Sequence, residues 1–164
     1  MRPEVIQFVG NVLNLWTGPV GTAIDIGSMD VNGTVRPEFE KRGWEYLGYD
    51  IEAGKNVDFV GNTDDLIFHF GAEKFEAVCS CETLEHLYDP IRAVESMRKI
   101  LKPGGLLILS CAGNGFPEHR HPVDCWRPLP DALKWMLRGM KKAVLGEIVV
   151  PNGQGILAFG IKEG

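Results

Sequence analysis

The sequence lacks a long apolar run. No stretch of its 164 residues reaches the roughly 20 consecutive apolar residues that a membrane-spanning helix needs. Gln7, Asn11 and Asn14 interrupt the apolar stripe near the N-terminus, and no basic leader precedes it, so we expect no signal peptide. These absences favour a cytoplasmic protein that has no membrane partner.

The sequence also lacks paired cysteines of the C-x-x-C type. Its four cysteines are Cys79, Cys81, Cys111 and Cys125. Three of them lie in or beside expected core strands, and we interpret them as reduced, buried thiols. A metal site made of Cys79, Cys81 and a histidine would not have the usual ligand spacing, so we expect no metal centre.

There is no excess of basic residues either. The chain has 17 basic and 22 acidic residues, a net charge of −5 and a pI near 5.4. Nucleic acids and anionic membranes favour a basic partner surface, so we expect neither. The apolar fraction of 45% and the charged fraction of 24% are ordinary for a soluble globular protein. We expect one domain over residues 1–164, present as a monomer or a homodimer.

The most informative stretch covers residues 22–33. A short apolar run ends at Asp25, and a loop with Gly27 and Gly33 leads into a helix-compatible segment. In this succession of strand, loop and helix, backbone N–H groups and the helix N-terminus can bind a small ligand. Twenty-five residues after Asp25, a second apolar run ends on Asp50, an acid placed to accept ribose hydroxyls. Together these features predict a nucleoside cofactor site.

Strand and helix patterns alternate along most of the chain and predict a parallel α/β sheet with helices on both faces. We expect strands at 22–25, 44–49, 57–60, 75–80, 106–110, 144–150 and 156–162, the last two forming an antiparallel hairpin. Helices are expected at 3–16, 34–42, 65–70, 90–101 and 130–140.

Three details of this pattern bear on the site. The first helix, within residues 1–18, is interpreted as packing on the sheet, with a flap beside the site as the alternative. The helix at 90–101 should bury Ile91, Val94, Met97 and Leu101. Residues 113–130 form a long irregular segment rich in His, Pro and Trp, which a compact domain rarely keeps without a use.

From residue 22 to 161 the chain resembles the class I S-adenosylmethionine-dependent methyltransferases. The resemblance rests on Asp25 to Gly27, on Asp50, on the stretch from Phe75 to Leu87, on the turn from Leu101 to Gly105 and on the final hairpin. The usual GxGxG-like loop is replaced here by a subgroup variant that ends in Asn32 and Gly33, which can still supply left-handed geometry. The resemblance implies a Rossmann-like sheet of seven strands.

The resemblance also assigns residues to an S-adenosylmethionine site. Backbone groups near Gly27 would touch the methionine part and Asp25 its amino end, while Asp50 would hold the ribose. Adenine would lie against Ile51 and the residues that follow strand three. The full set that the resemblance implies is Asp25, Gly27, Ser28, Met29, Asp50, Ile51, Asn62, Thr63 and Cys81. Asn62 and Cys81 stand where the family often has Asp and Asn.

Methyl transfer requires alignment of acceptor and methyl group, and sometimes a base that removes a proton. The catalytic candidates are His86, His119, His121 and Asp124, with Glu85 as a further possible base. A cofactor-side or structural role for His86 stays open. So does a capping role for residues 119–127, in which Asp124 pairs with Arg120 or Arg127.

The function predicted from the sequence is methyl transfer from S-adenosylmethionine to a small-molecule acceptor. Two alternatives remain. A catalytically silent methyltransferase-like module, acting as a binding or partner subunit, would keep the cofactor fold without turnover. A nicotinamide-binding Rossmann domain would share the glycine loop and Asp50, although the third glycine is missing and the final hairpin does not suit it.

Overall fold

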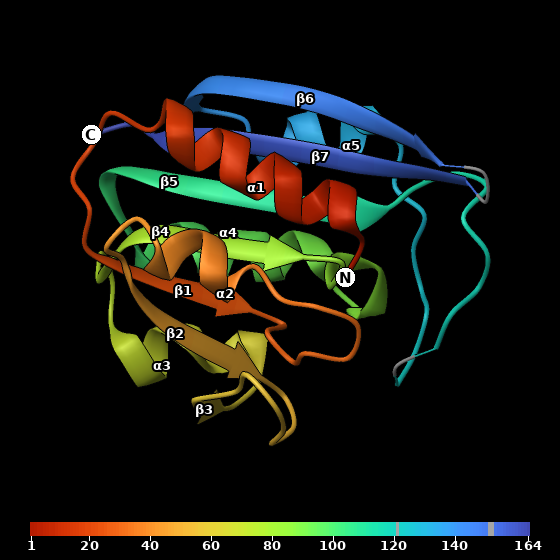
Figure 1. Cartoon of the computed structure of the whole chain (residues 1–164), viewed down its shortest axis with the longest axis horizontal. Coiled ribbons are helices and arrows are strands. Elements are labelled where there is room, and N and C mark those ends of the chain that lie inside the picture. Colours follow the sequence, from red (N-terminus) through yellow and green to blue (C-terminus); the bar gives the residue numbers. More distant parts are fainter. Residues whose placement is uncertain (121, 151–152) are drawn as a thin grey trace.

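The computed structural model describes residues 1–120, 122–150 and 153–164, which form a seven-stranded sheet between two helical layers (Figure 1). The strand order is β3-β2-β1-β4-β5-β7-β6. The strands are β1 (Thr22–Ile26), β2 (Glu45–Asp50), β3 (Phe59–Val60), β4 (Phe75–Cys81), β5 (Leu101–Ala112), β6 (Met140–Val150) and β7 (Gly153–Lys162). β1 to β5 pair in parallel, whereas β7 pairs antiparallel with both β5 and β6. The predicted fold class is confirmed.

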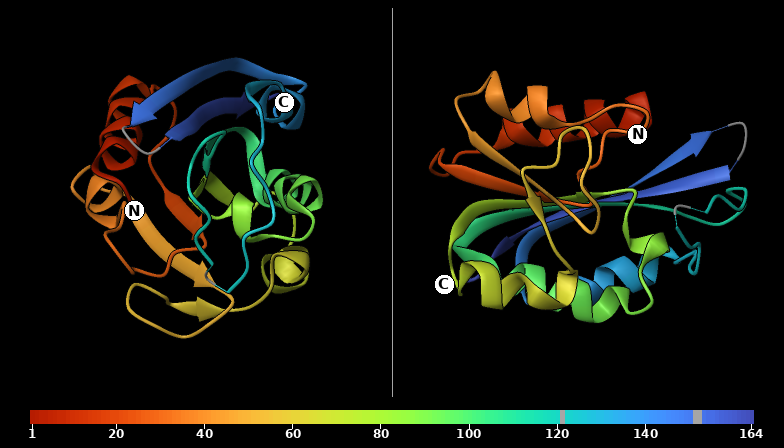
Figure 2. Two further views of the ribbon diagram at one scale, coloured as in Figure 1. Left: turned by 90° about the vertical axis from the view of Figure 1, so that its right-hand side faces the viewer. Right: turned by 90° about the horizontal axis from the view of Figure 1, so that it is seen from below.

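The helices cover both faces of the sheet (Figure 2). α1 (Pro3–Leu15) and α2 (Arg36–Glu40) lie on one face. The other face carries the 3₁₀ helix η1 (Thr63–Asp65), α3 (Leu66–Phe70), α4 (Pro90–Ile100) and α5 (Pro130–Met136). A short 3₁₀ helix, η2 (Leu84–His86), follows β4. None of the helices in the described ranges is both long and apolar enough to span a membrane.

Apolar spacing explains how the long helices pack. Val5, Val9 and Val12 of α1 recur at helical intervals and are buried against the sheet, as predicted. In α4, the Asp89 carboxylate accepts a hydrogen bond from Arg92 N at 3.0 Å and caps the helix. The expected burial of Ile91 is wrong, because this side chain is 39% exposed.

The buried face of α4 is formed instead by Pro90, Ala93, Val94, Met97 and Ile100. The pattern i, i+3, i+4, i+7 therefore begins at Pro90, one residue earlier than predicted. Leu101 is buried, but it begins β5 and pairs with Phe75.

Several boundaries of helices and strands differ from the prediction. β3 has only two residues; it is the edge strand of the sheet and pairs with β2. β6 starts at Met140 rather than 144, and α5 correspondingly ends at Met136. Residues 151 and 152 of the predicted final turn lie outside the described residues. The carboxyl ends of β1, β2, β4 and β5 all meet at one edge, beside the N-terminus in Figure 1.

Candidate active site

The loop after β1 is held by the backbone of the neighbouring strand. Gly27 N and Ser28 N both donate to the carbonyl of Tyr49, at 2.8 and 3.2 Å. Gly27 has a φ of 83°, in the left-handed region that favours glycine. A Cβ on Gly27 would lie 2.1 Å from the Thr83 hydroxyl oxygen. The contact with Thr83 therefore requires glycine at position 27. The sequence analysis had linked this glycine only to the close approach of a ligand.

Asp50 links the tip of β2 to that loop. One carboxylate oxygen accepts a hydrogen bond from Met29 N at 2.9 Å, and the other accepts from Glu52 N at 3.3 Å. The side chain of Ile51 is 55% exposed beside it. A carboxylate oxygen has two lone pairs, so Asp50 keeps acceptor capacity for a ligand. The structure thus brings Asp50, Met29 and Ile51 together at one edge of the sheet.

Asp25 lies beneath the loop and is nearly fully buried. The Tyr46 hydroxyl donates to its Oδ2, while Oδ1 has no partner among the described residues. The pKa of Asp25 is raised to about 7, mainly by burial; the Tyr46 hydrogen bond opposes this rise and the Asp50 charge adds to it. Asp25 is therefore an ionisable group at the inner wall of the site.

The remaining predicted cofactor residues fall at the same edge. The Asn62 side chain accepts from Asp64 N at 3.1 Å and caps η1, and Thr63 follows directly. Gly61 N donates to Asp50 O at 2.8 Å, which places this turn next to the tip of β2. Cys81 ends β4 with its side chain buried, its Sγ 3.5 Å from that of Cys79. Only the backbone of Cys81 can face a ligand, as expected.

Glu85 of η2 is the main anchor of the long loop between β5 and α5. Its side chain is fully buried, and its Oε1 accepts from Ala112 N at 3.2 Å. Its carbonyl accepts from Cys125 N at 2.7 Å and from Trp126 N at 3.3 Å. Burial acts to raise the pKa of Glu85, but the neighbouring His119 and the backbone donors lower it overall. A charged carboxylate is thus stabilised inside the protein.

The imidazole ring of His119 lies between hydrogen-bond acceptors. Its Nε2 is 3.7 Å from Glu85 Oε1, and its Nδ1 is 3.2 Å from Pro117 O and 3.7 Å from an oxygen of Asp124. The Glu85 carboxylate is the main cause of a raised pKa for His119, against a smaller effect of burial. Because both ring nitrogens face acceptors, this arrangement favours the doubly protonated ring.

His86 is placed differently from His119, although their ring centroids are 5.0 Å apart. His86 Nδ1 lies 2.6 Å from the carbonyl oxygen of Val123, so Nδ1 carries the proton and donates. Nε2 then has a free lone pair. Of the two described histidines in this cluster, His86 is the one whose geometry suits proton acceptance.

Asp124 holds the loop rather than a histidine ring. The Arg127 guanidinium donates to both carboxylate oxygens, and His119 N donates to one of them at 2.7 Å. Pairing with Arg127 outweighs desolvation and holds the pKa of Asp124 well below its usual range. Arg120 instead pairs with Glu118 at 2.6 Å. His121 lies outside the described residues, so its predicted role stays a prediction.

Three side chains with metal-ligand chemistry lie close together, and each has a protein contact through at least one of its polar atoms. Within the part of the chain that the structure describes, the group with suitable spacing is Glu85, His86 and His119, with ligand atoms within 4.8 Å of one another. The hydrogen bonds of Glu85 to Ala112 N and of His86 to Val123 O, with the Glu85–His119 pair, give this group a role without an ion. The prediction of no metal centre remains untested.

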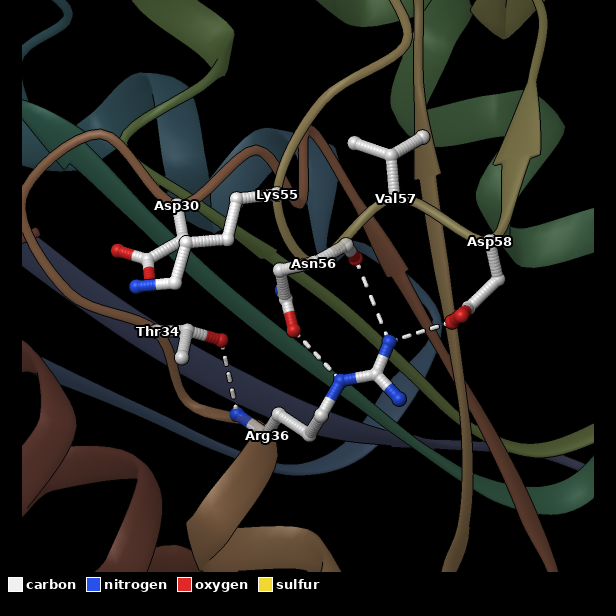
Figure 3. Close-up of a pocket in the computed structure, with 7 residues that line it drawn as sticks. All are labelled: Asp30, Thr34, Arg36, Lys55, Asn56, Val57 and Asp58. Atoms are coloured by element: carbon white, nitrogen blue, oxygen red, sulfur yellow. Dashed lines mark hydrogen bonds and ion pairs between the residues drawn. The ribbon is translucent and has the colours of Figure 1, made fainter.

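Two cavities flank these residues. One, of about 500 Å³, lies on the α2 side of the glycine loop, residues 27–35 (Figure 3). It is lined by Asp30, Thr34, Arg36, Lys55, Asn56, Val57 and Asp58. The other, of about 320 Å³, lies in the long loop and is lined by Phe116, Glu118, Asp124, Cys125, Trp126 and Arg127. Neither Asn56 nor Arg36 was predicted from the sequence as a site residue. The sequence offered a signal for Asn56 alone: it is an asparagine in a polar turn, and asparagine tolerates positive φ.

Comparisons with known proteins agree with the geometry. A family model described as a methyltransferase domain matches residues 5–140. A ubiquinone biosynthesis O-methyltransferase from Cereibacter sphaeroides is 30% identical over 91 residues, 56% of this chain and 34% of that protein. The namesake from Haemophilus ducreyi is 49% identical over 64 residues, 37% of this chain and 27% of that protein. These matches span about a third or less of the curated relatives.

Solved structures share the fold at low sequence identity. A Burkholderia thailandensis 1,6-didemethyltoxoflavin-N1-methyltransferase, solved with 1,6-didemethyltoxoflavin and S-adenosylhomocysteine, matches with a TM-score of 0.77 and 15% identity, over 98% of this chain and 79% of that chain. An Archaeoglobus fulgidus SAM-dependent methyltransferase matches with a TM-score of 0.73 and 14% identity, over 99% and 95%. The chain therefore belongs to the methyltransferase domain family and has the fold of the class I S-adenosylmethionine-dependent methyltransferases.

Proposed function

We propose that this protein transfers a methyl group from S-adenosylmethionine to a small-molecule acceptor. The observation that carries the proposal is the junction of the glycine loop with Asp50, made by the 2.9 Å hydrogen bond from Met29 N. It sets loop amides and the Asp50 carboxylate side by side at the carboxyl edge of a parallel sheet, where ligands of open α/β folds bind. The names of the relatives, O-methyltransferases and an N-methyltransferase of a small heterocycle, support this class of reaction.

The residues at this edge fit the cofactor in their chemistry. Asp50 would accept the ribose hydroxyls, the exposed face of Ile51 would cover adenine, and Asn62 and Thr63 would meet the adenine edge. The backbone of Gly27, Ser28 and Cys81 would face the methionine part, with Asp25 behind it. When bound, the cofactor supplies an already activated methyl group, so the protein has to align the acceptor and exclude water.

On the acceptor side, His86 is the candidate that this geometry supports best as a base. Its Nδ1 is fixed on Val123 O, so Nε2 can accept a proton from a hydroxyl or amine acceptor. His119 would contribute positive charge beside the buried Glu85 carboxylate. Asp124 would hold the loop through Arg127, and a role for His121 remains a prediction. The acidic chain and the 320 Å³ cavity suit a small acceptor better than nucleic acid.

Calorimetric titration with S-adenosylmethionine, S-adenosylhomocysteine and NAD tests the cofactor. We expect both sulfur ligands to bind and NAD not to bind, whereas selective binding of NAD would establish a nicotinamide site. Release of S-adenosylhomocysteine is then measured with a panel of hydroxylated, amino and carboxylate acceptors. Binding without turnover on any acceptor would favour the silent module.

A further inference from the structure

Asn56 joins the two loops that form the cofactor edge. We name residues 27–35 the glycine loop and residues 51–58 the ribose loop. The Asn56 amide Nδ2 donates to Ser28 O at 2.7 Å, and the Ser28 hydroxyl donates back to Asn56 O at 3.2 Å. Ser28 is 3% exposed, so these two bonds are largely shielded from water. The reciprocal pair fixes the ribose loop to the start of the glycine loop.

A second set of bonds attaches the same residue to α2. Arg36 Nε donates to Asn56 Oδ1 at 2.5 Å, and Arg36 Nη2 donates to Asn56 O at 3.3 Å (Figure 3). Arg36 also pairs with Asp58, whose carboxylate accepts from Gly48 N at 2.7 Å. Arg36 is the first residue of α2, so α2, β2 and both loops are held around one asparagine side chain.

The backbone of Asn56 is held in an uncommon conformation. Its φ is 72°, which non-glycine residues adopt rarely and asparagine tolerates best. β2 passes so close that a Cβ on Gly48 would lie 2.0 Å from Asn56 O. Such backbone conformations persist where contacts with the surrounding structure hold them in place, and they are common at functional sites. Here the surroundings are the bonds from Ser28 and Arg36.

The polar groups of the Asn56 side chain are occupied by protein. Nδ2 donates to Ser28 O and, at 3.3 Å, to the Tyr46 hydroxyl, which itself donates to the buried Asp25. Oδ1 accepts from Arg36. Asn56 therefore has no free donor for a ligand and can affect one only through the loops that it holds.

We propose that Asn56 is a positioning residue that fixes the glycine loop and the ribose loop at the separation the cofactor bridges. The inference rests on the proposed function, because it needs one ligand to contact both loops. Asp50, directly before the ribose loop, bonds Met29 N in the glycine loop. Without the Asn56 side chain, the two loops keep the hydrogen bond from Asp30 N to Lys55 O at 3.0 Å and the Asp30–Lys55 ion pair. Those links act at position 30, whereas the Asn56 amide holds the backbone of Ser28 at the start of the glycine loop.

The test compares Asn56→Gly with Glu73→Gly in the full chain. Glycine keeps the left-handed backbone at 56 and removes every side-chain bond. Glu73 is a matched control, because it is also a non-glycine residue with positive φ (54°), in the turn between α3 and β4. Both exchanges add the same flexibility to the unfolded chain. We expect S-adenosylhomocysteine to bind Asn56→Gly about tenfold more weakly, and Glu73→Gly within about twofold of the parent.

A ligand-free measurement separates positioning from general stability. Hydrogen exchange at Gly27, Ser28 and Met29, whose amides bond Tyr49 and Asp50, should accelerate in Asn56→Gly and stay at the parent rate in Glu73→Gly. If Asn56→Gly does not fold, Arg36→Lys keeps Asn56 in place and loosens the bonds of residue 36 to Asn56 and Asp58, and we expect a smaller change in the same direction.

The outcomes distinguish this inference from the proposed function. If the parent does not bind S-adenosylhomocysteine, the proposed function is overturned, and the positioning role is overturned with it. If the parent binds and the Asn56 variant binds equally well, with unchanged exchange in the glycine loop, the proposed function stands and only the role of Asn56 is overturned. Weaker binding with faster exchange in that loop supports both.

Discussion

The cofactor edge and the long loop of residues 113–129 are built by different forces. At the cofactor edge, backbone amides and carbonyls take part in most contacts, as in the bonds of Ser28 with Asn56 and of Gly27 with Tyr49, and charged side chains such as Arg36 add to them. The long loop is fixed mainly by charges, through the buried Glu85 carboxylate and the Asp124–Arg127 pair. The first region depends on chain geometry, and the second depends on which ionisable groups meet.

This difference follows from the connections between the strands. The glycine loop and the ribose loop extend from neighbouring strands of the parallel sheet, and Asp50 and Asn56 link them directly. The long loop leaves the last parallel strand and crosses to α5 on the other face (Figure 2). Gly113 and Asn114 at its start bond Gln154 of β7, but beyond them the described residues of the loop have no strand as a backbone partner. Charged side chains take that place. We therefore expect substitutions in the two regions to have separable effects on cofactor affinity and on turnover.

The largest effect should come from His86→Asn. The asparagine amide can still donate to Val123 O, so the loop keeps its anchor, but the free ring nitrogen is lost. If His86 is the base, turnover should fall by roughly 10²–10⁴-fold with S-adenosylhomocysteine affinity unchanged. Turnover, calorimetric affinity and melting temperature are measured on the same preparation. Full turnover in a folded His86→Asn would remove His86 from the chemistry.

Gly27→Ala should break the cofactor edge. The new Cβ meets the Thr83 hydroxyl at 2.1 Å and also suffers the left-handed penalty. Gly43→Ala is the control, since Gly43 has a φ of 82° and nothing within 4 Å of its Cβ position. Gly43→Ala should cost about 1–2 kcal/mol of unfolding free energy, and Gly27→Ala about 1–3 kcal/mol more. Only Gly27→Ala should also lose the rise in melting temperature caused by S-adenosylhomocysteine.

Equal unfolding free energies for these two alanine variants, measured by urea denaturation, would contradict the close contact with Thr83. A normal ligand-induced shift in Gly27→Ala would show that the glycine loop does not approach the cofactor.

Asp50→Ala should weaken cofactor binding without affecting the long loop. Charge-assisted hydrogen bonds from ribose hydroxyls contribute roughly 1.5–3 kcal/mol each, so affinity for S-adenosylmethionine should fall at least about tenfold. Part of the loss will come from Met29 N, which gives up its acceptor. Asp50→Asn keeps an acceptor oxygen and should retain more affinity. Calorimetric titration decides, and an unchanged dissociation constant in folded Asp50→Ala would exclude the ribose contact.

The same difference explains what could be predicted from the sequence. β1, the glycine loop, β2 and Asp50 follow from local apolar runs and turn residues, and the structure places them as expected. The pairing of Asp124 with Arg127 was one of the two pairings expected for a capping segment at residues 119–127, but the role of Glu85 could not be predicted from local pattern. Glu85 bonds Ala112 N and anchors the backbone of Cys125. Contacts over such sequence separations depend on tertiary packing, which periodicity does not encode.

Asn56 was missed for a related reason. Its bonds run to Ser28 and Arg36, 28 and 20 residues away, and nothing in the residue type distinguishes it from an ordinary turn asparagine. Asp124 was a catalytic candidate because it lies with His119 and His121 in residues 119–127. In the structure, Arg127 takes both of its carboxylate oxygens.

The smallest effect concerns Asp25, a nearly fully buried ionisable group at the cofactor edge. Its pKa is about 7 in the folded protein, against 3.8 ordinarily, mainly because of burial, with Asp50 adding and Tyr46 and Arg36 opposing. Between these two values the unfolded chain has lost a proton that the folded chain keeps, so the contribution to stability falls as pH rises towards 7. The amide introduced by Asp25→Asn would stay neutral throughout. The advantage of Asp25→Asn over the parent should therefore grow between pH 6 and pH 8, by on the order of 1 kcal/mol or roughly 2–4 °C.

Melting curves of the ligand-free parent and of Asp25→Asn at pH 6 and pH 8 measure this difference. Asp65→Asn makes the same change of charge on an exposed residue and should show no such trend. Parallel changes in the parent and in Asp25→Asn would mean that Asp25 is ionised at both pH values, with Tyr46 and bound water solvating it. The cofactor edge would then tolerate a buried charge as well as the long loop tolerates Glu85, and the contrast between the two regions would lie in their connections alone.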